Sequence, residues 1–482
     1  MNASTKNSIS TATAHPVGTR TPGGRNLGQR AVVLGGSLAG LLSASVLSRY
    51  FDQVVIVERD DLARHPGGPR RGVPQSRHTH GLLVAGSLAM ERLLPGLTAD
   101  LRSQGALQVD FNSRLRWWLG GAVQYRFTSA LEGLLTSRSL LEDEVRRHVL
   151  RFPNIVLLGG YDVAGLVTSD DRRRVLGAQV ARREPSKTPD DQADSLIEDG
   201  SVLGDLVVDA SGRGSRATTW LTDLGYPAVK ESVVEAGLTY ATRCFRSRPG
   251  VLDDLDGDII GSDPAGSRSG VALRQEDGIW SVTLAGSFGE RPPTELDEFR
   301  AFARTLPTPG IAEVATECDP VGEPQTFHYP NSRWRHWEKL SVRPERFTVL
   351  GDAFCSFNPV YGQGMSSAAL QAEALTGALD GGLDALPERA AKSFARVVAT
   401  PWTLATGTDR RHVSQPAKPL PERLLDRYLD RLMLVAAHDQ EVKLAFNRVL
   451  NLLAAPPSLL TPRVAVRVLR PGRRRARATV AA

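Results

Sequence analysis

The stretch VVLGGSLAGLL, residues 32–42, holds the first residues whose types and spacing could do chemistry. Gly35, Gly36 and Gly40 stand between an apolar run and a helix-like run, and Glu58 ends the next apolar run. Glycine permits a tight turn, and the N–H groups of the following helix can bind a pyrophosphate. An acidic residue at the end of the second strand can accept a ribose hydroxyl. The pattern predicts a dinucleotide site; the alternative is an ordinary strand–helix turn with a surface glutamate.

Ser37 stands where the usual glycine fingerprint has its middle glycine. A Cβ at this position costs clearance beneath a pyrophosphate, but serine is small and its hydroxyl can donate to a phosphate oxygen. We therefore expect the site to tolerate Ser37 and to use its hydroxyl as a hydrogen-bond donor.

The second group of such residues lies in TVLGDAFCSFNPVYGQGMSSAAL, residues 348–370. Asp352 follows an apolar run, and its carboxylate can accept hydrogen bonds from sugar-like hydroxyls. Pro359 shapes a turn, and Gly362–Met365 leads directly into a helix-like run. The N-terminus of that helix offers free N–H groups and a positive dipole end to an anionic ring. Together the two groups predict one nucleotide-cofactor site assembled from distant parts of the chain.

Other kinds of reactive site are not indicated. Cys244, Cys318 and Cys355 are odd in number and far apart, which argues against a disulfide framework or a zinc site and favours a reducing compartment. The chain has no phosphate-binding GxxxxGK[ST], no HExxH and no GxSxG motif. His148 and His438 are interpreted as ordinary surface or packed residues. We therefore expect no metal, and we assign no catalytic side chain, because the chemistry would be centred on the bound cofactor.

Strands and helices must position these residues, and the apolar periodicity indicates where they lie. Buried strands are predicted at 31–34, 53–58, 154–160, 203–212 and 346–352. Helices are predicted at 38–50, 82–94, 139–150 and 366–379, with mostly helical chain from 388 to 469. A polar hairpin excursion is expected over 169–200, and alternation over 225–344 indicates antiparallel strands with a turn at residues 276–278. The fold class is α/β, a Rossmann-like nucleotide-binding domain with an inserted β-rich substrate domain and C-terminal helices.

Composition is typical of a soluble protein with a sizeable core. The 482 residues are 41% hydrophobic and 23% charged, with no apolar stretch suited to spanning a membrane. The net charge of +6 is concentrated in arginines between residues 463 and 477, and no basic stripe with interleaved aromatics indicates a nucleic-acid partner. The first 29 residues are interpreted as a disordered leader, not a signal peptide, so the expected location is the cytoplasm. The oligomeric state is left open.

Six stretches resemble a known family. The two cofactor segments, together with RRGVPQSRHTHGLL, SRSLLEDEVR, DLVVDASGRGSR and GLTYATRCF, are similar to group A flavoprotein monooxygenases, which have the fold of para-hydroxybenzoate hydroxylase. More narrowly, they resemble the flavin-dependent epoxidases of polyether-ionophore biosynthesis, such as those for lasalocid and monensin. The resemblance covers most of residues 30–405.

This resemblance implies that FAD is the cofactor, NAD(P)H the reductant and O2 a co-substrate. It implies FAD-binding roles for Gly35, Gly36, Ser37, Leu38, Ala39, Gly40, Glu58, Arg59, Arg77, Arg138, Val163, Asp352, Pro359, Gly362, Gln363, Gly364 and Met365. Arg138 would lie against the flavin or its ribityl chain, and Val163 beside the adenine. For Arg71, Arg77 and His80 the match is to the basic loop as a whole, with a solvated loop as the alternative.

Composition and periodicity also divide the chain into parts. The expected parts are a disordered leader (1–29), an FAD-binding domain in two parts (30–225 and 346–405), a β-rich substrate domain (226–345), a C-terminal helical region (406–470) and a basic disordered tail (471–482).

Aromatic residues are the candidates for a substrate pocket. The residues proposed are Tyr240, Phe327, the tyrosine of the dipeptide Tyr329-Pro330, and Tyr361. Trp117-Trp118 and the stretch 328–337 are the aromatic concentrations, and they could either line an apolar cavity or fill the core.

One departure from the family pattern concerns the reductant. Many group A hydroxylases have an Asp-Gly pair where this chain has Ser211-Gly212, so their nicotinamide site does not transfer directly. Residues 212–217, GRGSRA, could form a second nucleotide turn, but no second βαβ unit with an acidic strand end follows. A tight turn packed near the FAD domain is the favoured interpretation.

The resemblance implies epoxidation of an alkene in a large apolar polyketide or terpenoid intermediate, through a flavin C4a-hydroperoxide. An alkene can take the electrophilic oxygen without a protein acid or base if water is excluded, whereas phenol hydroxylation gains from a base. The alternatives are an aromatic hydroxylase of the same fold, a flavin-dependent halogenase, a prenyl reductase or a non-catalytic nucleotide-binding protein. The halogenase is disfavoured because no WxWxIP stretch occurs.

Overall fold

The computed structural model describes residues 25–62, 70, 74–183, 195–261, 266–287, 289–412 and 419–470. The predicted leader, apart from residues 25–29, and the predicted basic tail lie outside the described residues, as does Arg71.

A five-stranded parallel sheet carries the first cofactor segment. Its strands, in the order β18-β12-β1-β2-β8, are β18 (Phe347–Val349), β12 (Leu206–Asp209), β1 (Gly28–Leu34), β2 (Phe51–Glu58) and β8 (Ile155–Gly159). The apolar run Ala31–Leu34 is fully buried in the centre of the sheet. Parallel strands of this kind are covered on both faces, which explains why they are continuously apolar in the sequence. The predicted Rossmann-like core is confirmed.

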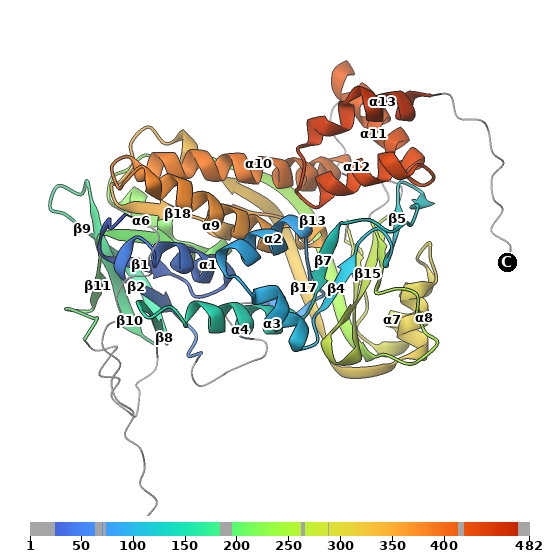
Figure 1. Cartoon of the computed structure of the whole chain (residues 1–482), viewed down its shortest axis with the longest axis horizontal. Coiled ribbons are helices and arrows are strands. Elements are labelled where there is room, and N and C mark those ends of the chain that lie inside the picture. The colour runs from blue at the N-terminus through green and yellow to red at the C-terminus, as the bar shows by residue number, and fades with distance from the viewer. Residues whose placement is uncertain are drawn as a thin grey trace, which may run out of the picture.

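Helices from both ends of the chain cover this sheet (Figure 1). They are α1 (Leu38–Leu47), α2 (Val84–Leu93), α3 (Leu97–Ser103), α4 (Arg138–Val149), α6 (Ala217–Asp223), α9 (Gly364–Asp380) and α10 (Leu386–His412). Helix α9 packs against α1, α2 and α10, so the second cofactor segment meets the first although more than 300 residues separate them. Helix α9 begins at Gly364, two residues before the predicted start.

A small antiparallel sheet is formed by β9 (Tyr161–Thr168), β10 (Val175–Arg182) and β11 (Ser201–Leu203). It matches the predicted polar hairpin excursion, although the strands begin earlier than expected. Residues 184–194 of this region lie outside the described part of the chain.

An eight-stranded sheet forms the β-rich domain. Its strands, in the order β19-β17-β13-β16-β15-β14-β5-β6, are β19 (Cys355–Ser356), β17 (Asp319–Arg335), β13 (Glu231–Arg246), β16 (Ile279–Gly286), β15 (Arg268–Gln275), β14 (Gly257–Ile260), β5 (Leu115–Leu119) and β6 (Ala122–Val123). Helices α7 (Leu296–Arg304) and α8 (Gly310–Glu317) pack on it, and the turn Glu276–Gly278 joins β15 to β16 as predicted. Strand β5 pairs in parallel with β14, so a segment from the first part of the chain completes this sheet. A third small sheet contains β3 (Gly81–Leu82), β7 (Glu132–Leu135) and β4 (Leu107–Asp110).

The C-terminal helices gather at one end of the molecule, next to β5 (Figure 1). They are α11 (Leu420–Ala436), α12 (Gln440–Leu450) and α13 (Pro462–Leu469), with the short helix η7 (Pro456–Leu460), and they share a small hydrophobic core of their own. Among the residues described, no helix has the length and apolar character needed to cross a bilayer.

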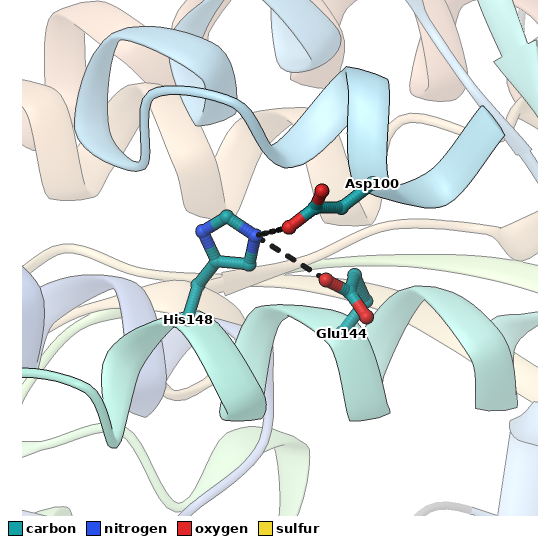
Figure 2. A group of neighbouring side chains, drawn as sticks. All are labelled: Asp100, Glu144 and His148. Carbon is teal, nitrogen blue, oxygen red and sulfur yellow. Dashed lines mark hydrogen bonds and ion pairs between the residues drawn. The ribbon is translucent and has the colours of Figure 1, made fainter. Parts of the chain in front are cut away.

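A polar cluster joins α3 to α4 (Figure 2). The Nε2 atom of His148 lies 2.9 Å from a carboxylate oxygen of Asp100 and 3.2 Å from one of Glu144. Their spacing would suit a metal ion. Arg147 already pairs with both carboxylates, however, so the cluster has its own cation and is interpreted as a link between helices.

Lys443 is an unusual buried cation. It lies on α12, is 1% exposed, and its Nζ has no hydrogen-bond partner among the described residues. The Nζ atom lies 5.5 Å from the centre of the Trp117 ring, a position that gives a weak cation–π attraction. Burial lowers the pKa of Lys443 to about 7.

Gly40 sets the close packing of α1 on β1. A Cβ at residue 40 would lie 1.8 Å from the backbone oxygen of Gly35, whereas a Cβ on Gly377 of α9 would meet nothing within 4 Å. We expect Gly40→Ala to lower the free energy of unfolding by about 1–3 kcal/mol or more, through overpacking. Gly377→Ala should raise it by up to ~1 kcal/mol, because alanine favours the helix. Urea unfolding measures both, and equal effects would contradict the packing argument.

Lys443 should make stability depend on pH. The unfolded chain keeps this proton up to the ordinary pKa of 10.5, whereas the folded protein releases it near 7, so stability rises with pH between these values. Lys443→Met should weaken that rise and increase the free energy of unfolding at pH 7, because no charge is then buried. Urea unfolding at pH 7, 8 and 9 tests this. Lys392→Met, at an exposed lysine of α10, is the control that should keep the wild-type slope.

Candidate cofactor and substrate site

One cavity of about 1300 Å³ connects the parallel sheet, the eight-stranded sheet and the C-terminal helices. This volume exceeds the roughly 300–1,000 Å³ of a typical small-molecule pocket and leaves room for a cofactor and a second ligand. The cavity begins at the carboxyl ends of the parallel strands, the edge where open α/β sheets bind nucleotides.

The turn after β1 forms one wall of the cavity. Gly35 has φ +103°, and a Cβ on it would lie 2.7 Å from the backbone oxygen of Ala210, so only glycine fits here without strain. Ser37, Leu38 and Ala39 line the cavity at the N-terminus of α1. No side chain caps this helix end, so its first N–H groups are available to an anion.

Glu58 lies at the end of β2, beside this turn, and is buried. Its Oε2 accepts a hydrogen bond from the Gly36 N–H at 2.7 Å, and its Oε1 accepts one from the Asp60 N–H at 2.9 Å. Arg59 and Val163, which were expected near the nucleotide, border the cavity next to it. Gly36 and Gly40 shape the turn from behind and do not line the cavity.

Arg70 is a site residue that the sequence did not single out. Its Nη1 lies 3.0 Å from Glu58 and 3.1 Å from Asp60, and its Nη2 pairs with Glu142. It also borders the cavity. The signal was weak because Arg70 is one of several arginines in a basic loop, and no spacing distinguishes it from its neighbours.

Ser37 takes part in a second ion-pair group with Arg138 and Glu142, both on α4. The Ser37 hydroxyl donates to Glu142 Oε2 at 2.8 Å and accepts from Arg138 Nη2 at 2.9 Å, while Arg138 pairs with Glu142 at 3.0 Å. The hydroxyl is therefore directed at Glu142 and not toward a ligand. Burial favours the neutral form of Glu142, but the guanidinium groups of Arg138 and Arg70 outweigh it and hold the pKa of Glu142 below its ordinary value. The i, i+4 spacing of Arg138 and Glu142 is the signal that could have revealed the pair.

The second cofactor segment lies across the cavity from the first turn. Asp352 borders the cavity, and burial raises the pKa of its carboxyl, against the opposing effect of Arg138. Pro359, Gly362, Gln363, Gly364 and Met365 all line the cavity as well. Helix α9 has no side-chain cap, and Gln363 Oε1 and Ser366 Oγ are buried there without a partner among the described residues.

The turn after β12 belongs to the same cavity. The carboxylate of Asp209 accepts hydrogen bonds from the Ser211 hydroxyl and the Ser215 hydroxyl, each at 2.5 Å, and burial raises its pKa. Ser211, Gly212 and Arg213 line the cavity beside Gly35. Residues 212–217 therefore contribute to the wall of the predicted cofactor site.

Aromatic residues line the part of the cavity next to the eight-stranded sheet. Tyr240, Phe327, Tyr329 and Tyr361 all border it, and Trp117 does too. Pro330 does not line the cavity. The two tryptophans of β5 separate, since Trp118 packs against the core under α7 and α8.

A row of polar side chains crosses this part of the cavity. The His78 Nδ1 atom lies 2.8 Å from the Thr242 hydroxyl, and hydrogen bonds continue from Thr242 to Thr283 and from Thr283 to Thr79. Burial lowers the pKa of His78 and that of His80 to about 4. Both imidazoles are therefore neutral at pH 7 and are weak bases.

Arg77, a predicted site residue, lies on the exposed surface. Its Nη1 donates to Gln325 Oε1 at 3.1 Å, and it does not border the cavity.

The residues at the polar end of the cavity fit FAD. The N-termini of α1 and α9, neither of which has a side-chain cap, face the same space. A carboxylate suited to a ribose stands at one end and the unpartnered Gln363 Oε1 at the other. Uncapped helix ends suit the phosphates and the anionic side of a flavin ring.

Comparison with known proteins gives two relatives. No protein-family model matches the chain. The chain is 33% identical over 436 residues to protein Rv3254 of Mycobacterium tuberculosis, a match that covers 88% of this chain and 89% of that protein. It is 22% identical over 371 residues to the FAD-dependent monooxygenase asqG of Emericella nidulans, which covers 72% of this chain and 59% of that protein.

Solved structures share the fold. The flavin-dependent brominase Bmp2 has a TM-score of 0.60 at 15% identity, with 87% of this chain and 92% of Bmp2 covered. The p-nitrophenol 4-monooxygenase PnpA of Pseudomonas putida DLL-E4 has a TM-score of 0.59 at 19% identity, with 88% of this chain and 99% of PnpA covered. The chain thus has the fold of the flavin-dependent monooxygenases, and it belongs to the family of the mycobacterial protein Rv3254.

Proposed function

We propose that this protein is an FAD-dependent monooxygenase that epoxidises an alkene of a large apolar polyketide or terpenoid intermediate, using NAD(P)H and O2. The observation that carries the proposal is the single cavity, whose polar end fits FAD and whose other end is lined by apolar and aromatic residues. The sequence similarity to the FAD-dependent monooxygenase asqG and the fold shared with p-nitrophenol 4-monooxygenase support the choice of cofactor. When bound, FAD supplies the activated oxygen.

The two histidines beside the predicted flavin-facing turn favour an alkene over a phenol. Hydroxylation of a phenol gains from a base that removes the phenolic proton. His78 and His80 have a pKa of about 4, because they are buried, and so are poorly suited to that role. An alkene needs only to be held in place and shielded from water, which the aromatic lining can do. Aromatic hydroxylation is the second candidate, supported by the shared fold with p-nitrophenol 4-monooxygenase.

Glu58 should contribute strongly to FAD binding. Glu58→Gln removes the negative charge of a carboxylate that borders the cavity and accepts a hydrogen bond from the Gly36 N–H. We expect FAD affinity to fall by about 1.5–3 kcal/mol, a factor of roughly 10–150 in Kd, because a charged hydrogen-bond acceptor is lost. Titration of the FAD-free protein, followed by quenching of flavin fluorescence, gives the Kd.

The control for this change is Glu132→Gln, at an exposed glutamate on β7 that hydrogen-bonds Gln108. Thermal unfolding of the FAD-free variants separates lost affinity from lost stability. An unchanged Kd in Glu58→Gln would contradict the assignment of the adenosine end.

Labelled oxygen tests the reaction itself. The FAD-loaded protein, NADPH or NADH and ¹⁸O2 are incubated separately with farnesol and with phenol, and the products are examined by mass spectrometry. We expect one labelled oxygen in an epoxide of farnesol and none in phenol. Label in phenol alone would contradict epoxidation and favour the aromatic hydroxylase. A colourless protein that takes up no FAD would contradict every flavin-dependent function.

A further inference from the structure

The C-terminal helices form one wall of the cavity. In the sequence, these helices follow both cofactor segments. Leu425, Leu429 and Met433 follow one another at intervals of four residues on α11, and all three border the cavity. Phe446 and Leu450 of α12 border it as well. Residues four apart share one helix face, so α11 presents a continuous apolar ridge to the cavity.

Helix α12 is fixed to the rest of the protein by buried amides. Asn447 hydrogen-bonds Asn112 ahead of β5, and the Asn451 Oδ1 atom accepts a hydrogen bond from the Val84 N–H at 3.2 Å. All three asparagines are nearly inaccessible to solvent. These buried amide hydrogen bonds tie α12 to residues 84 and 112, so this wall is a built part of the cavity, although the Asn447 Oδ1 atom is buried without a partner among the described residues.

The β5–β6 turn closes the cavity against α11. Gly120 and Gly121 border the cavity, and a Cβ on Gly120 would lie 2.8 Å from the Met433 Cβ. The Gln124 side chain donates to the Met433 backbone oxygen at 3.2 Å. Leu425 is 46% exposed, which places the open side of the cavity near the start of α11.

The lining of the cavity therefore changes from polar to mainly apolar along its length. A Cβ on Gly362 would lie 3.9 Å from the Gly81 backbone oxygen, so the predicted flavin-facing turn adjoins the residues around His80. The polar row from His78 to Thr79 lies at this end, whereas the wall from α11 and α12 is mainly leucine, methionine and phenylalanine. Asp426 and Asp430 of α11 also border the cavity, and both are engaged in polar interactions.

We infer that the α11–α12 wall binds the far end of an elongated hydrocarbon chain and limits the length of chain that the enzyme accepts, with Leu429 and Met433 as the residues that set this limit. The inference rests on the proposed function, because it assumes that the substrate occupies the cavity with its reacting end beside the flavin site. It assigns a role to residues 419–470 that the family resemblance does not cover.

A substitution that fills the far end should discriminate by chain length. In Met433→Trp, the larger side chain occupies space beside Leu429, so long chains lose contact there while short chains do not reach it. The probes are geraniol, farnesol and geranylgeraniol, which share an end group and differ in length. Equilibrium dialysis with tritiated alcohols measures the Kd on the FAD-loaded protein. We expect about a tenfold or larger loss of affinity for geranylgeraniol, the equivalent of roughly two buried methylene groups, and an unchanged Kd for geraniol.

Leu424→Trp is the matched control, since Leu424 lies on the same helix, is exposed and does not border the cavity. It should leave all three Kd values unchanged. The inference is overturned if Met433→Trp affects the three alcohols equally or not at all, if Leu424→Trp has the same effect, or if the wild-type protein binds none of them.

Turnover with ¹⁸O2 separates this inference from the proposed function. Binding that depends on chain length, without transfer of oxygen, would support the role of the α11–α12 wall and contradict the proposed epoxidase activity. If oxygen is transferred and Met433→Trp does not alter the preference for chain length, the proposed epoxidase activity is supported and the role of the α11–α12 wall is contradicted.

Discussion

The carboxylate of Glu142 is the constraint on which the cofactor end of this protein depends. It is buried, and a buried carboxylate is tolerated only if opposite charges and hydrogen bonds surround it. Its four partners come from three parts of the chain: Ser37 at the start of α1, Arg70 from the basic loop, and Arg138 and Arg146 from α4 itself. Arg70 continues the network to Glu58 at the end of β2. The ion pairs and hydrogen bonds of Glu142 and Arg70 thus fix the start of α1 relative to the end of β2.

This arrangement leaves the backbone free to bind a ligand. Ser37 uses its hydroxyl on Glu142, and Glu58 uses one oxygen on the Gly36 N–H. The side chains near the turn therefore hold one another, while the first N–H groups of α1 keep their hydrogen-bonding capacity. In contrast, the far part of the cavity has few charges, and its shape is determined by packing between the eight-stranded sheet and the C-terminal helices. Hydrogen bonds and ion pairs between polar side chains therefore hold the cofactor end of the cavity, whereas packing of apolar side chains shapes its far end.

Local sequence patterns predicted the parts of the site that depend on local geometry. The β1–α1–β2 unit, the Asp352 strand end and the start of α9 each follow from a few neighbouring residues, and all were found within two or three residues of the expected bounds. Arg70 and Glu142 were missed because their importance comes from ion pairs between segments far apart in sequence. The pairing of β5 with β14, and the packing of α12 against Asn112, are equally non-local. Ser37 was expected to bind a phosphate, but its hydroxyl donates a hydrogen bond to Glu142. No sequence spacing indicates this contact, because the two residues are more than 100 positions apart.

The place of β18 in the parallel sheet means that the cofactor end can be assembled only after residues 347–349 have been made. Strand β12 pairs with β1 on one side and with β18 on the other, and β18 begins only at Phe347. Until that residue has been made, β12 is an edge strand with unpaired backbone groups, and the Leu350 N–H that binds the Asp209 backbone oxygen is absent. Helix α9, which packs against α1, is made later still. A chain that has been made only as far as the glycine turn therefore lacks the strand and the helix that complete the candidate cofactor site, and pairing across such long separations makes folding slow.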